Sequence, residues 1–389
     1  MIPNIDWQSI TENGSSFLYD LDSLRQHLDY MQERHHALRL WYACKANPLS
    51  TLLKEIAKKS FSFDVASPGE LDQVLNIGAN PENILVTGPA KNEAFLEHAL
   101  LSGVQTFIIE SENQYKTLEY LTKKHSSTPK ILLRLQLDWK DKESSFIGGN
   151  AITPFGMDLP SAKALLPQIQ LPLLGFHVFQ WGNVLDLTKL EAIWRHIASI
   201  CKEIETPIQV IDLGGGLGIP YNLNEKPLLW KDVNITLERI KNQFSIPEIW
   251  LELGRYVVGA CGYYATKIVD RKTVRDHNLL ICAGGINHIA RPTLTHQHFP
   301  CTLARNSQSK SIPFNIHGPL CTALDFLGTH FLPEDIKIGD VLVFSQTGAY
   351  GFTESMPYFL CHELPNEIVL SQGALSFIRS SQTASTWLK

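Results

Sequence analysis

The stretch LWYACKANPLSTLLKEIAKKSFSFDVA, residues 40–66, carries the pattern that predicts the fold. It opens with an apolar run over residues 40–43, places apolar residues at helical spacing over 49–59, and returns to an apolar run over 63–66. A strand, a helix and a second strand in this order form a unit whose strands pair in parallel through a right-handed crossover. The stretch therefore predicts an α/β fold.

Similar runs continue this alternation as far as residue 253. Together with the first two they make eight expected strands, at residues 40–43, 63–66, 84–86, 107–109, 131–135, 174–177, 210–213 and 250–253. Residues 92–101, between two of these runs, also show helical spacing. Because eight strand and helix units are the number that closes a TIM barrel, we expect a (β/α)8 barrel.

After Arg255 the sequence pattern changes and favours strands, with apolar runs at 263–270, 279–282 and 340–344. A C-terminal, mainly β domain is therefore expected. The expected boundaries are residues 1–18 for an N-terminal segment that joins the β domain, 19–259 for the barrel and 260–389 for the β domain. Two polar, weakly periodic stretches, 138–150 and 291–313, are expected to be loops.

Composition narrows the class of protein. Of the 389 residues, 44% are hydrophobic and 19% are charged, which is enough apolar material for a large core. The net charge is -5 and the basic residues are scattered, so neither nucleic acid nor an anionic membrane is an expected partner. The first residues lack the pattern of a signal peptide and no apolar run reaches membrane-spanning length, so we expect a cytoplasmic protein.

The seven cysteines contain no C-x-x-C pair. An odd number without that spacing argues against a disulfide framework and against a zinc site. We therefore expect free thiols and no bound metal.

Polar residues and glycines follow the expected strands at the point where each strand ends. They are Lys45, Asp64, Arg134, His177, Gly214, Gly215, Gly216 and Glu252. Taken singly, each has an ordinary explanation, such as a solvated lysine, a helix cap or a tight turn. Since the carboxyl ends of barrel strands meet at one face, where barrel active sites are built, their shared placement predicts an active site.

Eight motifs follow one another in the order found in a known family. They are Phe17-Leu18-Tyr19-Asp20, Tyr42-Ala43-Cys44-Lys45-Ala46-Asn47, Phe63-Asp64-Val65-Ala66-Ser67, Gly175-Phe176-His177-Val178, Asp212-Leu213-Gly214-Gly215-Gly216, Glu252-Leu253-Gly254-Arg255, Gly318-Pro319-Leu320-Cys321 and Gly348-Ala349-Tyr350-Gly351. With them the chain resembles the pyridoxal-phosphate decarboxylases of barrel fold, the family of ornithine, arginine and diaminopimelate decarboxylases, which is related to alanine racemase. The resemblance implies the cofactor pyridoxal 5'-phosphate.

The resemblance also implies roles for individual residues. Lys45 would hold the cofactor's aldehyde as a Schiff base, and Glu252 would keep the ring nitrogen protonated. His177 resembles the catalytic histidine that lies flat against the ring. The other implied cofactor contacts are Asp64 and Arg134 around the ring, and Gly214, Gly215, Gly216, Gly254, Arg255 and Tyr350 near the phosphate.

Cys321 resembles the family's proton donor, which protonates the substrate's Cα after carbon dioxide has left. In that family the cysteine loop reaches into the neighbouring subunit's site, so the resemblance implies a homodimer with shared active sites. The ordinary alternative for a free cysteine is a small buried hydrophobe. Four more residues of this region are expected to contact the substrate, namely Thr322, Asn287, His288 and Tyr350.

The sequence departs from decarboxylases of free ornithine or lysine at two positions. Those enzymes place acidic residues near the substrate's distal ammonium, where this chain has Thr322 and Gly284. A buried ammonium without a carboxylate is costly, so such a substrate is disfavoured. A second departure is the bulky segment Val178-Phe179-Gln180-Trp181-Gly182 after the histidine, which puts the expected phosphate contacts there in question.

The segment Gly318–Asp325 is similar to a branch of the family that acts on modified amino acids. That branch includes enzymes for a glutamyl group on an acyl-carrier protein, for citryl-linked amino acids in siderophore pathways, and relatives near exosortase systems. The sequence thus predicts decarboxylation of a modified amino acid in siderophore or other secondary-metabolite biosynthesis. Three alternatives stay open: an amino-acid racemase, a decarboxylase of free diaminopimelate or ornithine, and a non-catalytic regulator.

Overall fold

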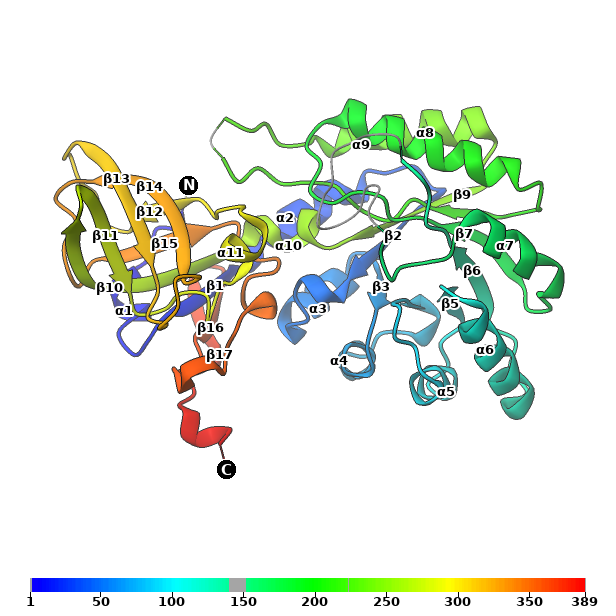
Figure 1. Ribbon diagram of the computed structural model, residues 1–389, viewed down its shortest axis with the longest axis horizontal. Helices are drawn as coiled ribbons and strands as arrows, with labels where there is room; N and C mark the ends of the chain where they lie inside the picture. The colour runs from blue at the N-terminus through cyan, green and yellow to red at the C-terminus, as the bar shows by residue number, and fades with distance from the viewer. Residues whose placement is uncertain (1, 140–151, 223, 389) are drawn as a thin grey trace. The chain divides into compact units, whose positions relative to one another are not determined.

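The computed structural model describes residues 2–139, 152–222 and 224–388 (Figure 1). The chain divides into two compact units. The barrel unit contains residues 27–219 and 226–257, and the β unit contains residues 1–26, 220–225 and 258–389. The boundaries expected from the sequence, after residues 18 and 259, stay a proposal about separately folding domains.

Eight parallel strands close the barrel and confirm the fold expected from the sequence. They are β2 (Leu38–Ala43), β3 (Ser62–Val65), β4 (Ile84–Val86), β5 (Thr106–Ile109), β6 (Lys130–Arg134), β7 (Leu173–His177), β8 (Val210–Asp212) and β9 (Glu248–Leu253). The barrel closes where β9 pairs with β2, with Leu40 opposite Leu251.

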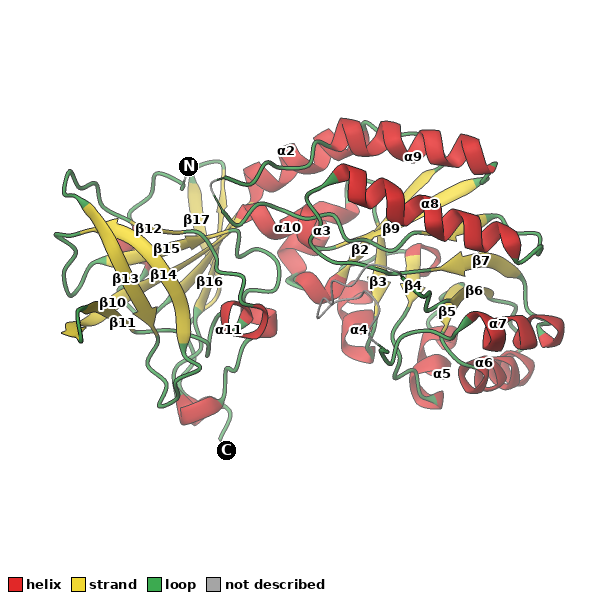
Figure 2. Cartoon of the chain, turned by 45° about the horizontal axis from the view of Figure 1, so that its top comes forward, coloured by secondary structure: helices red, strands yellow, loops and turns green. Residues whose placement is uncertain are grey.

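Helices surround the barrel strands, as Figure 2 shows in red. They are α3 (Ser50–Ala57), α4 (Pro68–Asn76), α5 (Glu93–Leu101), α6 (Glu112–His125), α7 (Leu159–Leu165), α8 (Leu187–Glu203) and α9 (Trp230–Phe244). Side chains just before several of them accept a hydrogen bond from the first turn, as Ser67 does at α4 and Asn92 at α5. The helices expected at 49–59 and 92–101 are confirmed as α3 and α5.

Two sequence boundaries between the units fall within the helices α2 (Leu21–Gln32) and α10 (Arg255–Val258). Among the helices of the described residues, none is both long enough and apolar enough to cross a lipid bilayer.

The barrel interior holds a cluster of buried apolar side chains. It comprises Trp41, Leu85, Ile108, Leu132, Val210 and Trp250. The rings of Trp41 and Trp250 pack with their centroids 4.8 Å apart. Because side chains fill its interior, this barrel is a packed core rather than a pore.

The β unit is built on a nine-stranded sheet. Its strands are β1 (Ser16–Asp20), β10 (Gly262–Val274), β11 (His277–Cys282), β12 (Cys301–Leu303), β13 (Ser311–His317), β14 (Phe326–Pro333), β15 (Val341–Ser345), β16 (Asn366–Ser371) and β17 (Ala374–Arg379). β1 pairs antiparallel with β10 and parallel with β16. The short helix α1 (Trp7–Ile10) packs its buried residues against Leu18 and Tyr263 in the core of this unit.

The prediction of a loop over residues 291–313 is wrong in part. Residues 291–313 contain the short helix α11 (Arg291–Thr295), strand β12 and the start of β13. β12 forms because it pairs with β15, a contact between segments distant in sequence that local polarity cannot reveal. The other expected loop, 138–150, lies mostly outside the described residues.

Candidate active site

The expected barrel residues lie at the carboxyl ends of the strands. Lys45 lies in a short helical turn directly after β2, Asp64 on β3, Arg134 and His177 at the ends of β6 and β7, and Glu252 on β9. Parallel pairing places His177 opposite both Arg134 and Asp212 in the neighbouring strands. The structure therefore brings these residues to one end of the barrel.

His177, Asp212 and Glu252 form the closest cluster. Each contributes a nitrogen or oxygen atom that lies within 4.8 Å of the others. His177 Nε2 lies 3.4 Å from Glu252 Oε2, and all three side chains are nearly inaccessible to solvent. Sequence reasoning did not single out Asp212, although it begins the Asp-Leu-Gly-Gly-Gly motif.

Several buried atoms of this cluster have no hydrogen-bond partner among the described residues. They are His177 Nδ1, Asp212 Oδ2 and Glu252 Oε1, while His177 Nε2 has only its 3.4 Å contact with Glu252. Asp212 Oδ1, in contrast, accepts a hydrogen bond of 2.8 Å from the Gly214 N–H. Because buried polar atoms are nearly always paired, the cluster has the character of a binding site for a polar group.

Burial and neighbouring charges shift the pKa values of the two carboxyl groups Asp64 and Glu252 in opposite directions. Burial and the Glu252 charge raise the pKa of Asp64 to about 8. Burial acts to raise the pKa of Glu252 as well, but the charges of His177, Lys45 and Arg134 outweigh burial and lower it. Burial lowers the pKa of His177, so the positive charge of this ring contributes less to lowering the pKa of Glu252. The charges of Lys45 and Arg134 still lower it. Glu252 is therefore the ionised carboxylate of the site.

A second buried network, which sequence reasoning missed, adjoins Arg134. Glu110 Oε1 lies 3.2 Å from Arg134 Nη1 and 3.4 Å from Lys91 Nζ, and Lys91 also donates to the Gly88 carbonyl. Glu110 Oε2 accepts a hydrogen bond from the Gly156 N–H. Burial lowers the pKa of Lys91 to about 8. The sequence does carry one signal for Glu110. It directly follows the expected strand at 107–109, just as other expected site residues lie at the ends of their strands.

The glycine motif packs against the segment that follows His177. Gly214 and Gly216 have positive φ angles of 64° and 94°. A Cβ at Gly214 would lie 2.8 Å from the Val178 carbonyl oxygen, and one at Gly216 would meet the Trp181 carbonyl. Glycine is therefore required both by the backbone conformation and by the close approach of the bulky 178–182 segment.

Four expected residues of the β unit lie on two loops, 283–290 after β11 and 318–325 between β13 and β14, whereas Tyr350 follows β15. Cys321 is exposed, whereas Asn287 and His288 are buried. His288 Nε2 donates to the Glu363 carbonyl and Nδ1 accepts from the Tyr264 hydroxyl, each at 2.8 Å. Burial lowers the pKa of His288 to about 4, so this ring is neutral.

Gly284 is one of the two positions at which the resemblance implies a missing acid. A Cβ at this residue would meet the Tyr264 hydroxyl, would lie 2.5 Å from His288 Nδ1 and 2.8 Å from Ser15 Oγ. The phenol of Tyr264 thus fills the space that an acidic side chain would need.

Arg291 is a further residue that sequence reasoning missed. Its side chain is buried, its Nη1 pairs with Glu354 at 2.5 Å, and its guanidinium carbon lies 4.7 Å from the Tyr350 ring centroid. Its Nε has no hydrogen-bond partner among the described residues. Tyr350 itself has a positive φ of 56°, a strained conformation for a non-glycine residue.

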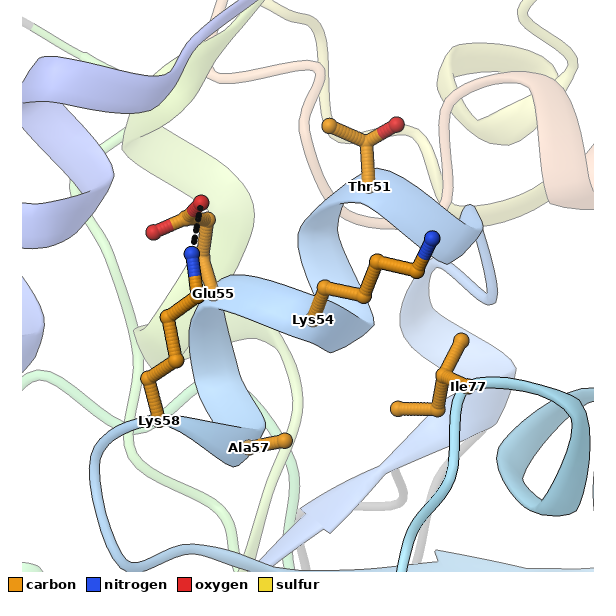
Figure 3. Close-up of a pocket in the computed structure, with 6 residues that line it drawn as sticks. All are labelled: Thr51, Lys54, Glu55, Ala57, Lys58 and Ile77. Carbon is orange, nitrogen blue, oxygen red and sulfur yellow. Dashed lines mark hydrogen bonds and ion pairs between the residues drawn. The ribbon is translucent and has the colours of Figure 1, made fainter.

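A surface pocket on α3 is separate from these residues (Figure 3). It is lined by Thr51, Lys54, Glu55, Ala57, Lys58 and Ile77. Lys58 reaches back to Glu55 at 2.9 Å, while Lys54 points away from that pair. The pocket contains none of the residues expected from the sequence to carry chemistry.

Comparison with known proteins identifies the family of the chain. The family model described as "Pyridoxal-dependent decarboxylase, pyridoxal binding domain" matches residues 21–259, which is more than half of the chain. The L-glutamyl-[BtrI acyl-carrier protein] decarboxylase of Niallia circulans is 27% identical over 98% of this chain and 95% of its own length. The 2-[(L-alanin-3-ylcarbamoyl)methyl]-2-hydroxybutanedioate decarboxylase of Staphylococcus aureus is 28% identical over 92% of this chain and 94% of its own.

Diaminopimelate decarboxylases are also similar. The enzyme of Aquifex aeolicus is 26% identical over 91% of this chain and 87% of its own. The solved structure of the Helicobacter pylori enzyme, complexed with L-lysine, has a TM-score of 0.88 at 23% identity and covers 98% of both chains. That structural likeness supports the fold. The family match assigns the chemistry: the chain belongs to the pyridoxal-dependent decarboxylases and is an amino-acid decarboxylase that uses pyridoxal phosphate.

Proposed function

We propose that this enzyme decarboxylates a conjugated or carrier-bound amino acid, in siderophore or other secondary-metabolite biosynthesis. The observation that carries the proposal is Gly284, where the Tyr264 hydroxyl occupies the space of an acidic side chain. With Thr322 at the other position, neither of the two positions offers a carboxylate to a distal ammonium. The printed names of the two relatives from Niallia circulans and Staphylococcus aureus describe substrates of this kind.

The residues of the barrel site fit the cofactor. Pyridoxal phosphate, when bound, supplies an electron sink for the bond that releases carbon dioxide. Lys45 would hold its aldehyde through the side-chain amine, and Glu252, the ionised carboxylate of the site, would sit beside the ring nitrogen. The atoms of His177 and Asp212 that lack partners supply further polar contacts.

Other residues complete the proposed cofactor site. His177 would lie against the ring, with Asp64 and Arg134 around it. The phosphate would be held by Gly214, Gly215, Gly216, Gly254, Arg255 and Tyr350. Burial and the Glu252 charge raise the pKa of Asp212, the third member of the His177 cluster.

Cys321 is proposed to donate the proton that the substrate's Cα receives. Its exposure on the 318–325 loop leaves the thiol accessible. In a homodimer with shared active sites, this loop would serve the partner subunit's substrate. Mixing Lys45→Ala and Cys321→Ala subunits tests this arrangement, because only a mixed dimer with shared sites can assemble an intact site from two chains that each lack one of these side chains. Activity restored on mixing supports shared sites, and none restored contradicts them.

The substrate class is tested by carbon dioxide release from a matched panel. The panel pairs a glutamyl-carrier protein and an amide-conjugated diaminopropionate with free diaminopimelate, ornithine and lysine. We expect kcat/KM to be higher for a conjugated substrate than for any free amino acid. Diaminopimelate as the preferred substrate would instead support the second candidate, to which the many diaminopimelate decarboxylase relatives point. Exchange of the Cα proton without gas release would support a racemase.

A further inference from the structure

The carboxylate of Asp325 joins the loop that carries Asn287 and His288 to the loop that carries Cys321 and Thr322. Its Oδ1 accepts a hydrogen bond of 2.8 Å from the Ile286 N–H, and its Oδ2 accepts one of 2.7 Å from the Leu320 N–H. The side chain is 1% exposed. One buried carboxylate therefore binds the backbone of the loop after β11 and the backbone of the loop after β13.

The two loops approach each other closely at a pair of glycines. A Cβ at Gly285 would lie 2.5 Å from the Gly318 Cα and would also meet Asp325 Oδ1, and a Cβ at Gly318 would meet the Gly285 Cα. Because β11 and β13 pair in parallel, both loops leave the sheet at the same end. Glycine at both positions lets the loops approach until a single carboxylate can reach both.

Cys321 lies at the apex of a turn that Asp325 holds on both sides. The Thr322 N–H donates to the Leu320 carbonyl at 2.8 Å, which closes a three-residue turn around Cys321. Before the cysteine, the Leu320 N–H is bound by the Asp325 carboxylate. After it, the Asp325 backbone N–H donates to the Thr322 carbonyl at 3.1 Å. Asp325 thus holds the backbone on both sides of the turn that carries the thiol.

We infer that Asp325 is a positioning residue that holds the Cys321 thiol in place for its proton transfer. The inference rests on the proposed role of Cys321. Asp325 does not reach the substrate in this proposal, and it acts only through the backbone on either side of the cysteine. Because the Asp325 carboxylate accepts one backbone N–H from each loop, it ties the cysteine turn to the neighbouring loop.

Asp325→Asn is the sharpest test, because the amide keeps the shape of the side chain but turns one acceptor into a donor facing an N–H. We expect turnover to fall about tenfold or more, with KM changed less, since a lost positioning bond acts on the reactive geometry. We also expect a larger share of the carbonyl product that forms when the proton reaches the wrong atom. Asp340→Asn is the matched control, because Asp340 is equally buried and accepts from Arg305 and from the Lys337 N–H.

The double variant separates positioning from a general structural effect. In the Cys321→Ala background, Asp325→Asn should slow turnover no further. An equal slowing in both backgrounds would overturn the inference. So would an unchanged rate and product ratio in Asp325→Asn alone.

Alkylation of the thiol separates this inference from the proposed function. Iodoacetamide labelling of Cys321, measured on its own peptide by mass spectrometry, should change severalfold in Asp325→Asn and stay unchanged in Asp340→Asn. If Cys321→Ala shows normal turnover and product, the proton-donor role fails, while a changed labelling rate still supports positioning. An unchanged labelling rate in a folded Asp325→Asn protein overturns positioning itself.

Discussion

The interior of the barrel and its carboxyl end are built from the same eight strands but from opposite kinds of side chain. On β9, Trp250 belongs to the apolar interior cluster, whereas Glu252, two residues further on, belongs to the charged cluster. On β8, Val210 and Asp212 show the same change over two residues. Every second residue of a strand points to the same side, so both pairs face the interior at successive levels.

The contrast separates stability from chemistry. The apolar cluster removes large aromatic surfaces from water and leaves the Trp41 and Trp250 rings packed together. The charged end does the reverse, because it buries carboxylates close enough to raise the pKa of Asp64 and leaves polar atoms of His177 and Glu252 without partners. Such groups destabilise a protein on their own, so we expect substitutions at the two levels to have different consequences.

Trp41→Ala should have the largest effect on stability. Removing this fully buried side chain leaves a cavity in the barrel interior, and we expect a loss of about 3–5 kcal/mol in the free energy of unfolding. Denaturant titration measures the loss. Tyr120→Ala, an exposed aromatic on α6, serves as the control and should change stability by about 0.5 kcal/mol or less. A Trp41→Ala protein as stable as the control would show that the interior cluster is not the source of stability.

Glu252→Gln should have the largest effect on turnover. The change keeps the shape of the side chain and removes the ionised carboxylate, so we expect kcat to fall about 10²–10³-fold. The yellow absorption of bound cofactor should persist, because Lys45 is intact. Steady-state kinetics and absorption spectra of one preparation measure both. Normal turnover would remove Glu252 from the proposed site.

Lys91→Met should change how stability depends on pH. The pKa of Lys91 is about 8 in the folded protein and 10.5 in the unfolded chain, so between these values the unfolded state holds more protons. Stability of the natural protein relative to Lys91→Met should therefore rise with pH across this window, by up to about 3 kcal/mol. Unfolding titrations at several pH values test it. Lys58→Met, at an exposed lysine, should show no such rise, and a flat difference for Lys91→Met would contradict the buried network.

Ser67→Ala should have the smallest effect. Ser67 accepts a hydrogen bond from the Glu70 N–H at the start of α4, just after Asp64 and its strand. Loss of this cap should cost about 1 kcal/mol of stability and leave kcat unchanged. Ser67→Asp, which restores an acceptor, should recover the stability. A drop in kcat that Ser67→Asp does not recover would show that the helix start takes part in the site.

The barrel could be predicted because most residues of its strands are buried, so that short apolar runs mark the strands in the sequence. The 40–43 and 63–66 runs correspond to β2 and β3, and the helical spacing between them corresponds to α3. The strands of the β unit were harder to predict. β12, for example, is three residues long and forms through pairing with the distant strand β15. A short strand in a polar stretch has no local pattern that distinguishes it from a loop.

The barrel residues of the site followed from position, since a polar residue at the end of a parallel strand must lie at the barrel's carboxyl end. Lys91 and Arg291 had no such position, and their importance appears only in their partners, Glu110 and Glu354. The packing of the glycine motif against Val178 and Trp181 was likewise visible only in three dimensions.

Sequence alone determined the strand and helix alternation, the family and the order of its motifs, because local apolar periodicity and residue identity encode them directly. Tertiary structure decided which buried charges pair, that Tyr264 fills the space beside Gly284, and that Asp325 holds the turn around Cys321. The physical reason is that hydrogen bonds, ion pairs and steric exclusion depend on distances between residues far apart in the chain, and folding sets those distances.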